Sequence, residues 1–287
     1  MNESLQELEA RLKGIEETAE RDEMEAKFAQ ELKNYKGIDE VISFKDVKDL
    51  PPAPFFSSGL RRLDMLIEGF HECDLIVVTG PTGQGKTTLL QTFTINLSKQ
   101  SVKSLWFTYE VSLINLLRKF GNDLPDGYAP KVLSESSIIW IERKIVESMV
   151  KFGVKAVFID PFNSLIRFSS PKLSQELGDL AERIKQMAIK YNIIIIVSAH
   201  ARKLGEDEVM SEDIIRDTAL LASKADSILT LWRGKEKQHR EEKRENGIMY
   251  KNESTVSVVK NRLNGNIGSL KVIHDGNKFL TSDSSIQ

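Results

Sequence analysis

Short apolar runs recur along most of the chain, and stretches with helical periodicity separate the first five of them. Each run is too short for a buried helix and predicts a strand. The predicted strands are Leu75–Val78, Ser104–Thr108, Ala156–Ile159, Ile193–Val197, Ser227–Leu231 and Thr255–Val259. Apolar strands that alternate with helices predict an α/β fold, with a mostly parallel sheet covered by helices on both faces.

The first 36 residues follow a different pattern, in which apolar residues lie three or four positions apart. Leu5, Leu8 and Leu12 begin this stripe, and Met24 resumes it after a break. The pattern predicts a helix, and its excess of acidic side chains argues against a nucleic-acid-binding arm. A helix with one apolar stripe must bury it. The sequence leaves open whether the stripe packs on its own subunit or on a neighbouring one.

A proline-rich segment at 51–54 separates this helix from the α/β region. Proline cannot continue a helix and favours an extended linker. We therefore expect an N-terminal helix with its linker over 1–50 and one α/β domain over 51–287. The segment Arg233–Asn246 is dense in charges of both signs and is predicted to be an exposed hairpin tip or loop.

Composition excludes several classes of protein. Of the 287 residues, 40% are hydrophobic, enough for a sizeable core, and the net charge of −2 leaves nucleic-acid contacts to local patches. The single cysteine, Cys73, excludes an intramolecular disulfide and a zinc module built on C-x-x-C. The acidic N-terminus resembles neither a secretory signal nor a transit peptide, and no apolar run approaches transmembrane length. We therefore expect a cytoplasmic protein with no membrane partner.

The segment that follows the first strand matches the phosphate-binding pattern G-x-x-x-x-G-K-[ST] in full. It lies between a predicted strand and a predicted helix, which is the context that the pattern requires. Glycines let backbone N–H groups surround phosphate oxygens, and the helix N-terminus attracts negative charge. The predicted nucleotide-binding residues are Gly80, Pro81, Thr82, Gly83, Gln84, Gly85, Lys86, Thr87 and Thr88. We expect ATP and Mg²⁺ as cofactors, with Lys86 on the β- and γ-phosphates and the Thr87 hydroxyl on Mg²⁺.

Three further polar residues follow predicted strands, at the edge where parallel sheets bind their ligands. Glu110 is a candidate to orient and deprotonate the attacking water, although it is also consistent with a solvated loop acid. Asp160 ends an apolar strand, as a carboxylate that binds Mg²⁺ does, and is otherwise consistent with a helix N-cap. His200 is a candidate sensor of the γ-phosphate, although a lone histidine is commonly structural.

Lys260 and Arg262 end the last predicted strand and flank Asn261. Residues two apart on a strand share a face, so the two cations can point together. One interpretation is an ordinary exposed basic pair. The other is a pair that acts in trans on a neighbour's ATP and stabilises the charge that develops on the γ-phosphoryl group.

With these residues assembled, the chain resembles the RecA-fold ring ATPases of the DnaB/Twinkle replicative helicase group over residues 55–279. Besides the phosphate-binding loop, the similar segments are 58–64, 105–112 with the catalytic glutamate, 199–203 with an H-x-R-K pattern, and 260–268 with a K-x-R-x-x-G pattern. The resemblance implies a hexamer with ATP at subunit interfaces. It also implies 5′→3′ translocation on single-stranded DNA and separation of duplex strands.

The resemblance assigns DNA contacts to two loops, one with Arg167 and Lys172 and the other with Arg202 and Lys203. Acidic residues at 206–208 weaken the second assignment. Replicative relatives usually carry a large N-terminal partner domain, whereas about 50 residues precede the core here, so we expect a separate primase or loader.

Two other functions compete with that of a DNA helicase or translocase without its own primase. One is a RadA-like recombination ATPase that binds DNA without unwinding it, although one cysteine cannot build the zinc module of that branch. The other is a KaiC-type regulatory ATPase whose partners are proteins. Stimulation of hydrolysis by DNA separates the last function from the first two, and unwinding of a forked duplex separates the first two from each other.

Overall fold

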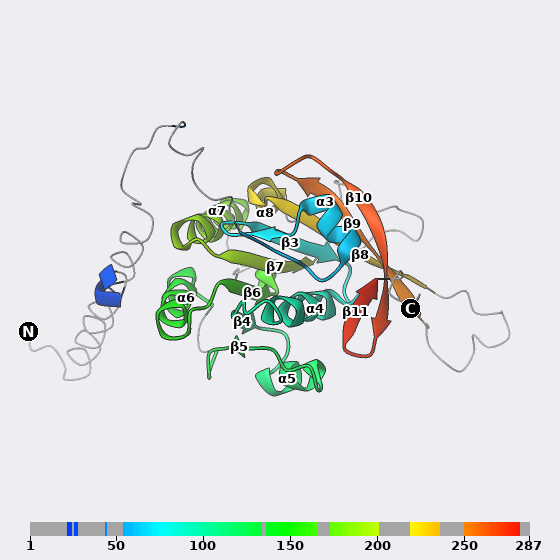
Figure 1. Cartoon of the computed structure of the whole chain (residues 1–287). Coiled ribbons are helices and arrows are strands. Elements are labelled where there is room, and N and C mark those ends of the chain that lie inside the picture. The colour runs from blue at the N-terminus through cyan, green and yellow to red at the C-terminus, as the bar shows by residue number, and fades with distance from the viewer. Residues whose placement is uncertain are drawn as a thin grey trace, which may run out of the picture.

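The computed structural model describes residues 22–24, 26–27, 44, 54–133, 136–165, 173–200, 219–235 and 250–281. A nine-stranded sheet forms the centre of the molecule (Figure 1). From one edge to the other, its strands are β11 (Lys278–Thr281), β10 (Gly268–Asp275), β9 (Tyr250–Asn261), β8 (Ser227–Lys235), β3 (Leu75–Gly80), β7 (Ile194–His200), β6 (Ala156–Asp160), β4 (Ser104–Thr108) and β5 (Gly127–Tyr128). A separate pair, β1 (Phe55–Phe56) and β2 (Phe70–His71), forms a small antiparallel sheet.

The strands from β8 to β5 are all parallel, whereas β9, β10 and β11 are added antiparallel at the β8 edge. The α/β fold with a mostly parallel sheet is therefore confirmed. β10 and β11 were not predicted. Their buried residues Leu270, Val272 and Phe279 are separated by polar or exposed positions, so the apolar signal in each strand is weak.

Helices cover both faces of the sheet, and the strands alternate their side chains between two cores. On β7, Ile194 and Ile196 point to one core, while Ile195 and Val197 point to the other. Helices α3 (Arg61–Ile67), α4 (Lys86–Ser98) and α5 (Leu113–Phe120) pack on the first face. Helices α6 (Ile138–Phe152), α7 (Leu173–Tyr191) and α8 (Ala219–Lys224) pack on the second. This double coverage explains why the parallel strands read as continuous apolar runs.

The predicted strand Ser104–Thr108 has the observed bounds of β4, and four other predicted strands lie within longer ones. The predicted strand Ile193–Val197 begins one residue before β7 and ends three residues before the end of β7. The extensions of β3, β6 and β7 carry Gly80, Asp160 and His200, which are the last residues of their strands. Within the predicted N-terminal helix, residues 22–24 and 26–27 are helical. The rest of that helix, most of the linker, and the predicted loop beyond Lys235 lie outside the described residues.

Among the described residues, no helix is long and apolar enough to cross a membrane.

The first core depends on aromatic packing at its centre, where Trp106 stacks on Phe158 with ring centroids 4.9 Å apart. Phe158 has no exposed surface. We expect Phe158→Ala to lower the free energy of unfolding by about 3–5 kcal/mol, because it removes buried apolar surface and leaves a cavity. The matched control is Ile139→Ala, at a side chain that is 54% exposed, with an expected change below about 0.5 kcal/mol. Urea unfolding measures both, and similar losses in the two variants would contradict the assignment of the core.

Candidate nucleotide site

The phosphate-binding loop lies between the carboxyl end of β3 and the first turn of α4. Gly83 and Gly85 adopt φ angles of +81° and +97°, which favour glycine. The loop also packs closely on neighbouring strands: a Cβ on Gly80 would lie 2.4 Å from the backbone oxygen of Leu231, and one on Gly85 would lie 3.1 Å from the ring of Phe279. The loop glycines therefore serve packing on β8 and β11 as well as phosphate access.

Lys86 is the first residue of α4, and its side chain folds back across the loop. Its Nζ donates to the backbone oxygens of Gly80 at 2.8 Å and Pro81 at 3.0 Å. Burial lowers the pKa of Lys86, and the negative charges of Asp160 and Glu110 act in the opposite direction. The ammonium group is therefore held inside the loop, close to the carboxylates at the ends of the neighbouring strands.

Asp160 links three elements through its buried carboxylate. Its Oδ2 accepts a hydrogen bond of 2.7 Å from the Thr87 hydroxyl on α4, and its Oδ1 accepts one from the Ser198 hydroxyl on β7. A hydroxyl and a carboxylate at this spacing are oxygen ligands of the kind that Mg²⁺ prefers. The donor set at Thr87 and Asp160 therefore fits the magnesium ion that the sequence predicts.

Glu110 and His200 come from different strand ends and meet beside this pair. His200 Nε2 lies 2.7 Å from Glu110 Oε1, and the backbone N–H of His200 donates to Asn163 Oδ1 at 3.1 Å. The His200 Nδ1 atom is buried and has no hydrogen-bond partner within the described part of the chain. The Glu110 side chain is 49% exposed, so water can reach it. This contact restricts the orientation of both side chains.

Lys260 and Arg262 lie far from this site. Their neighbour Asn261 pairs with Ser227, which pairs with Ile76 near the amino end of β3, whereas the loop starts at Gly80 on the carboxyl end. Four strand residues, or roughly 13 Å, separate those two levels of the sheet. The pair cannot contact the phosphate site of its own chain in this arrangement.

Two side chains that contact the site were not predicted from the sequence. Ser198 binds Asp160, and Asn163 binds the His200 backbone. Ser198 carried a signal, because it is a polar residue within an apolar strand and shares a face with His200. The nucleotide contact expected of Gln84 stays a prediction; its side-chain Oε1 accepts from the Arg233 N–H at 2.6 Å and anchors the loop to β8. The candidate DNA contacts Arg167, Lys172, Arg202 and Lys203 lie outside the described residues.

The fold and the phosphate-binding loop together define a P-loop protein with a RecA-like fold. The family model of the DnaB-like helicase C-terminal domain matches residues 56–121. A probable replicative DNA helicase of Trieres chinensis is 23% identical over 273 residues, which cover 83% of this chain and 59% of that protein. The resemblance to DnaB-like helicases is confirmed, and the chain spans about 59% of the length of this relative.

Other comparisons agree on the core. The circadian clock oscillator protein KaiC of Synechococcus elongatus is 32% identical over 122 residues, which cover 39% of this chain and 24% of KaiC. A solved DnaB-like replicative helicase, described with its interactions with primase, superposes with a TM-score of 0.66 at 15% identity. That match covers 92% of this chain and 75% of the solved one, and it supports the fold.

The close approach of Gly80 to Leu231 gives a test of the loop geometry. We expect Gly80→Ala to weaken ATP binding at least tenfold, because its Cβ meets backbone that cannot rotate away and the loop must shift. Gly153→Ala is the matched control, since it lies at the end of α6, outside the loop, its Cβ meets nothing within 4 Å and only its positive φ is strained, at a cost of about 1 kcal/mol. Titration with a fluorescent ATP analogue measures both, and equal affinities for the two variants would contradict the packing argument.

Proposed function

We propose that the protein is an ATP-driven DNA helicase or translocase that acts as a ring oligomer on single-stranded DNA. The observation that carries this proposal is that the candidate hydrolytic residues come together at the carboxyl ends of the parallel strands. Lys86, Thr87 and Asp160 lie together there, and the Glu110–His200 pair lies beside them. The similarity to a probable replicative DNA helicase supports DNA as the track.

Each residue of this edge has a role in phosphoryl transfer to water. The loop N–H groups and Lys86 bind the phosphates, and Thr87 and Asp160 would hold Mg²⁺, which would neutralise charge on the phosphate oxygens. Glu110 orients the water and accepts its proton, because its carboxylate is partly exposed and already hydrogen-bonded to His200. His200 connects the glutamate to the γ-phosphate position.

The second requirement of the proposal is an oligomer. A hydrolytic site needs positive charge to stabilise the transferring group. Lys260 and Arg262 lie at the amino ends of the parallel strands, whereas their own loop lies at the carboxyl ends. These cations therefore serve the ATP of a neighbouring subunit, with six subunits as the expected number. Single-stranded DNA then contacts the segments that carry Arg167, Lys172, Arg202 and Lys203, and a primase or loader is an expected partner.

One observation favours a second function, a regulatory ATPase of the KaiC type that does not act on DNA. KaiC is more similar in sequence, at 32% identity, but over a shorter stretch of this chain. ATP turnover in the absence and presence of single-stranded DNA separates the two functions. We expect DNA to raise turnover at least tenfold and the effect to fall as salt rises, because phosphate contacts release counterions. Turnover that is indifferent to DNA would contradict the helicase and favour the regulatory ATPase.

A forked duplex then tests unwinding itself. The helicase predicts ATP-dependent release of one strand. Stimulation by DNA without strand release would instead indicate a translocase or a recombination ATPase.

Replacement of the proposed base gives a test of the chemistry. We expect Glu110→Gln to lower ATP turnover by about 10²–10⁴, the usual contribution of a positioned general base, and to leave ATP affinity near the wild-type value. The amide keeps the shape of the side chain but cannot accept the proton from water. Glu147→Gln is the matched control, because this partly exposed acid pairs with Lys144 and Lys151 of its own helix, α6, which leads into the amino end of β6. Single-turnover hydrolysis measures both variants, and wild-type rates in Glu110→Gln would assign the water to another residue.

A further inference from the structure

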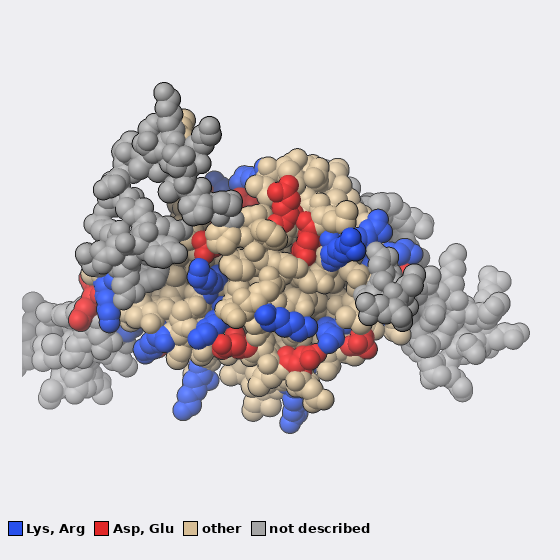
Figure 2. Space-filling model, in the orientation of Figure 1, with Lys and Arg blue, Asp and Glu red and all other residues tan. Residues whose placement is uncertain are grey.

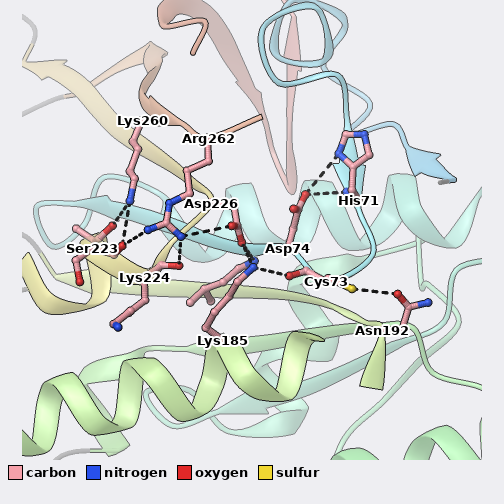
Figure 3. Close-up of polar contacts among 12 residues, drawn as sticks. His71, Cys73, Asp74, Lys185, Asn192, Ser223, Lys224, Asp226, Lys260 and Arg262 are labelled. Atoms are coloured by element: carbon pink, nitrogen blue, oxygen red, sulfur yellow. Dashed lines mark hydrogen bonds and ion pairs between the residues drawn. The ribbon is translucent and has the colours of Figure 1, made fainter. Parts of the chain in front are cut away.

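Lys260 and Arg262 are held by their own chain in a specific way. Lys260 Nζ donates to the backbone oxygen of Ala222 at 2.7 Å and to that of Ser223 at 3.3 Å (Figure 3). Arg262 donates to the backbone oxygens of Ser223 and Lys224, the latter at 3.3 Å. These three carbonyls form the C-terminus of α8, where helix carbonyls lack intrahelical partners and attract cations. The two cations therefore share one set of backbone carbonyl acceptors.

Asp226 lies two residues after the end of α8 and connects these carbonyls to the sheet. Its backbone oxygen accepts from the Arg262 N–H at 2.8 Å, and its Oδ1 lies 3.8 Å from Arg262 Nη1. Its Oδ2 accepts from the backbone N–H of Leu75 at 2.7 Å and from Lys185 Nζ at 2.6 Å (Figure 3). One carboxylate thus connects the start of β3, helix α7 and the end of β9.

The charges explain why a carboxylate is needed at this point. Lys185 and Arg262 approach the same place from opposite sides and would repel each other without an anion between them. The Asp226 side chain is 18% exposed, so solvent screens these contacts less than those of a surface pair. Arg262 has a long side chain with many rotamers and is 47% exposed, so its orientation depends on the few contacts described here.

We propose that Asp226 is a positioning residue that orients Arg262 toward the nucleotide of a neighbouring subunit. This inference rests on the proposed function of the two cations and adds the group that orients Arg262. A cation that is already oriented does not have to be ordered during the reaction, so this arrangement raises the rate of turnover and leaves nucleotide binding to the chain's own loop unchanged.

A double-mutant cycle on the assembled full chain tests the inference, with Asp226→Asn, Arg262→Ala and the double variant. Asparagine keeps an acceptor for the Leu75 N–H, removes the charge and replaces the other carboxylate oxygen by a donor NH2 group. We expect Asp226→Asn to lower kcat for DNA-stimulated ATP hydrolysis about tenfold, the coupling typical of contacting charged groups. We expect affinity for a fluorescent ATP analogue to stay within about twofold, and Asp226→Asn to cause no further loss of kcat in the Arg262→Ala background.

Asp74→Asn is the matched control, because this acid lies in the same cluster but accepts from the His71 N–H at 2.8 Å (Figure 3). We expect it to keep wild-type kcat. Unchanged kcat in Asp226→Asn would overturn the inference, as would an equal loss with and without Arg262, which would indicate a general effect on the fold. If Arg262→Ala alone keeps full turnover, the result contradicts the proposed role of Arg262 in ATP hydrolysis, on which the positioning role rests. If Arg262→Ala loses turnover while Asp226→Asn does not, only the positioning role fails.

Discussion

The carboxylate of Asp160 is the group on which the arrangement of the site depends. It is buried, and a buried negative charge is costly unless hydrogen bonds and nearby positive charge compensate for it. Two hydroxyls, from Thr87 and Ser198, supply the hydrogen bonds, and the ammonium of Lys86 lies close enough to influence it electrostatically. Because Thr87 and Ser198 come from α4 and β7, these contacts also hold the first turn of α4 over the ends of β6 and β7.

A second constraint is the packing of the phosphate-binding loop on the strands beside it. Gln84 bonds to the β8 backbone, Gly80 approaches Leu231 on the same strand, and Gly85 approaches Phe279 on β11. The antiparallel strands β9 to β11 therefore do more than extend the sheet. They bring the C-terminal part of the chain back against the loop, although β9 ends at the opposite edge of the sheet.

The sequence predicted the parts whose signal is local. Strands buried on both faces are continuous apolar runs, and the phosphate-binding pattern is eight adjacent residues, so the parallel sheet and the loop were both predictable. Glu110, Asp160 and His200 were identified because parallel strands end at one edge. The rest depends on tertiary contacts. β10 and β11 are partly exposed and lack a strong apolar pattern, and the contact between Gln84 and β8 joins residues 149 positions apart.

The placement of Lys260 and Arg262 at the amino end of the parallel strands also constrains how subunits can associate under the proposed function. The amino-end surface with the two cations (the cation edge) must face the carboxyl-end surface with the loop (the loop edge) of another copy. Because these two surfaces differ, the interface is head-to-tail and not two-fold symmetric. A head-to-tail interface closes into a ring or continues as a filament, depending on the rotation between copies. Every subunit then supplies one loop edge and one cation edge. The sheet connects the two edges within each subunit, and Asp226 anchors the cation edge to the start of β3, the strand that leads into the loop.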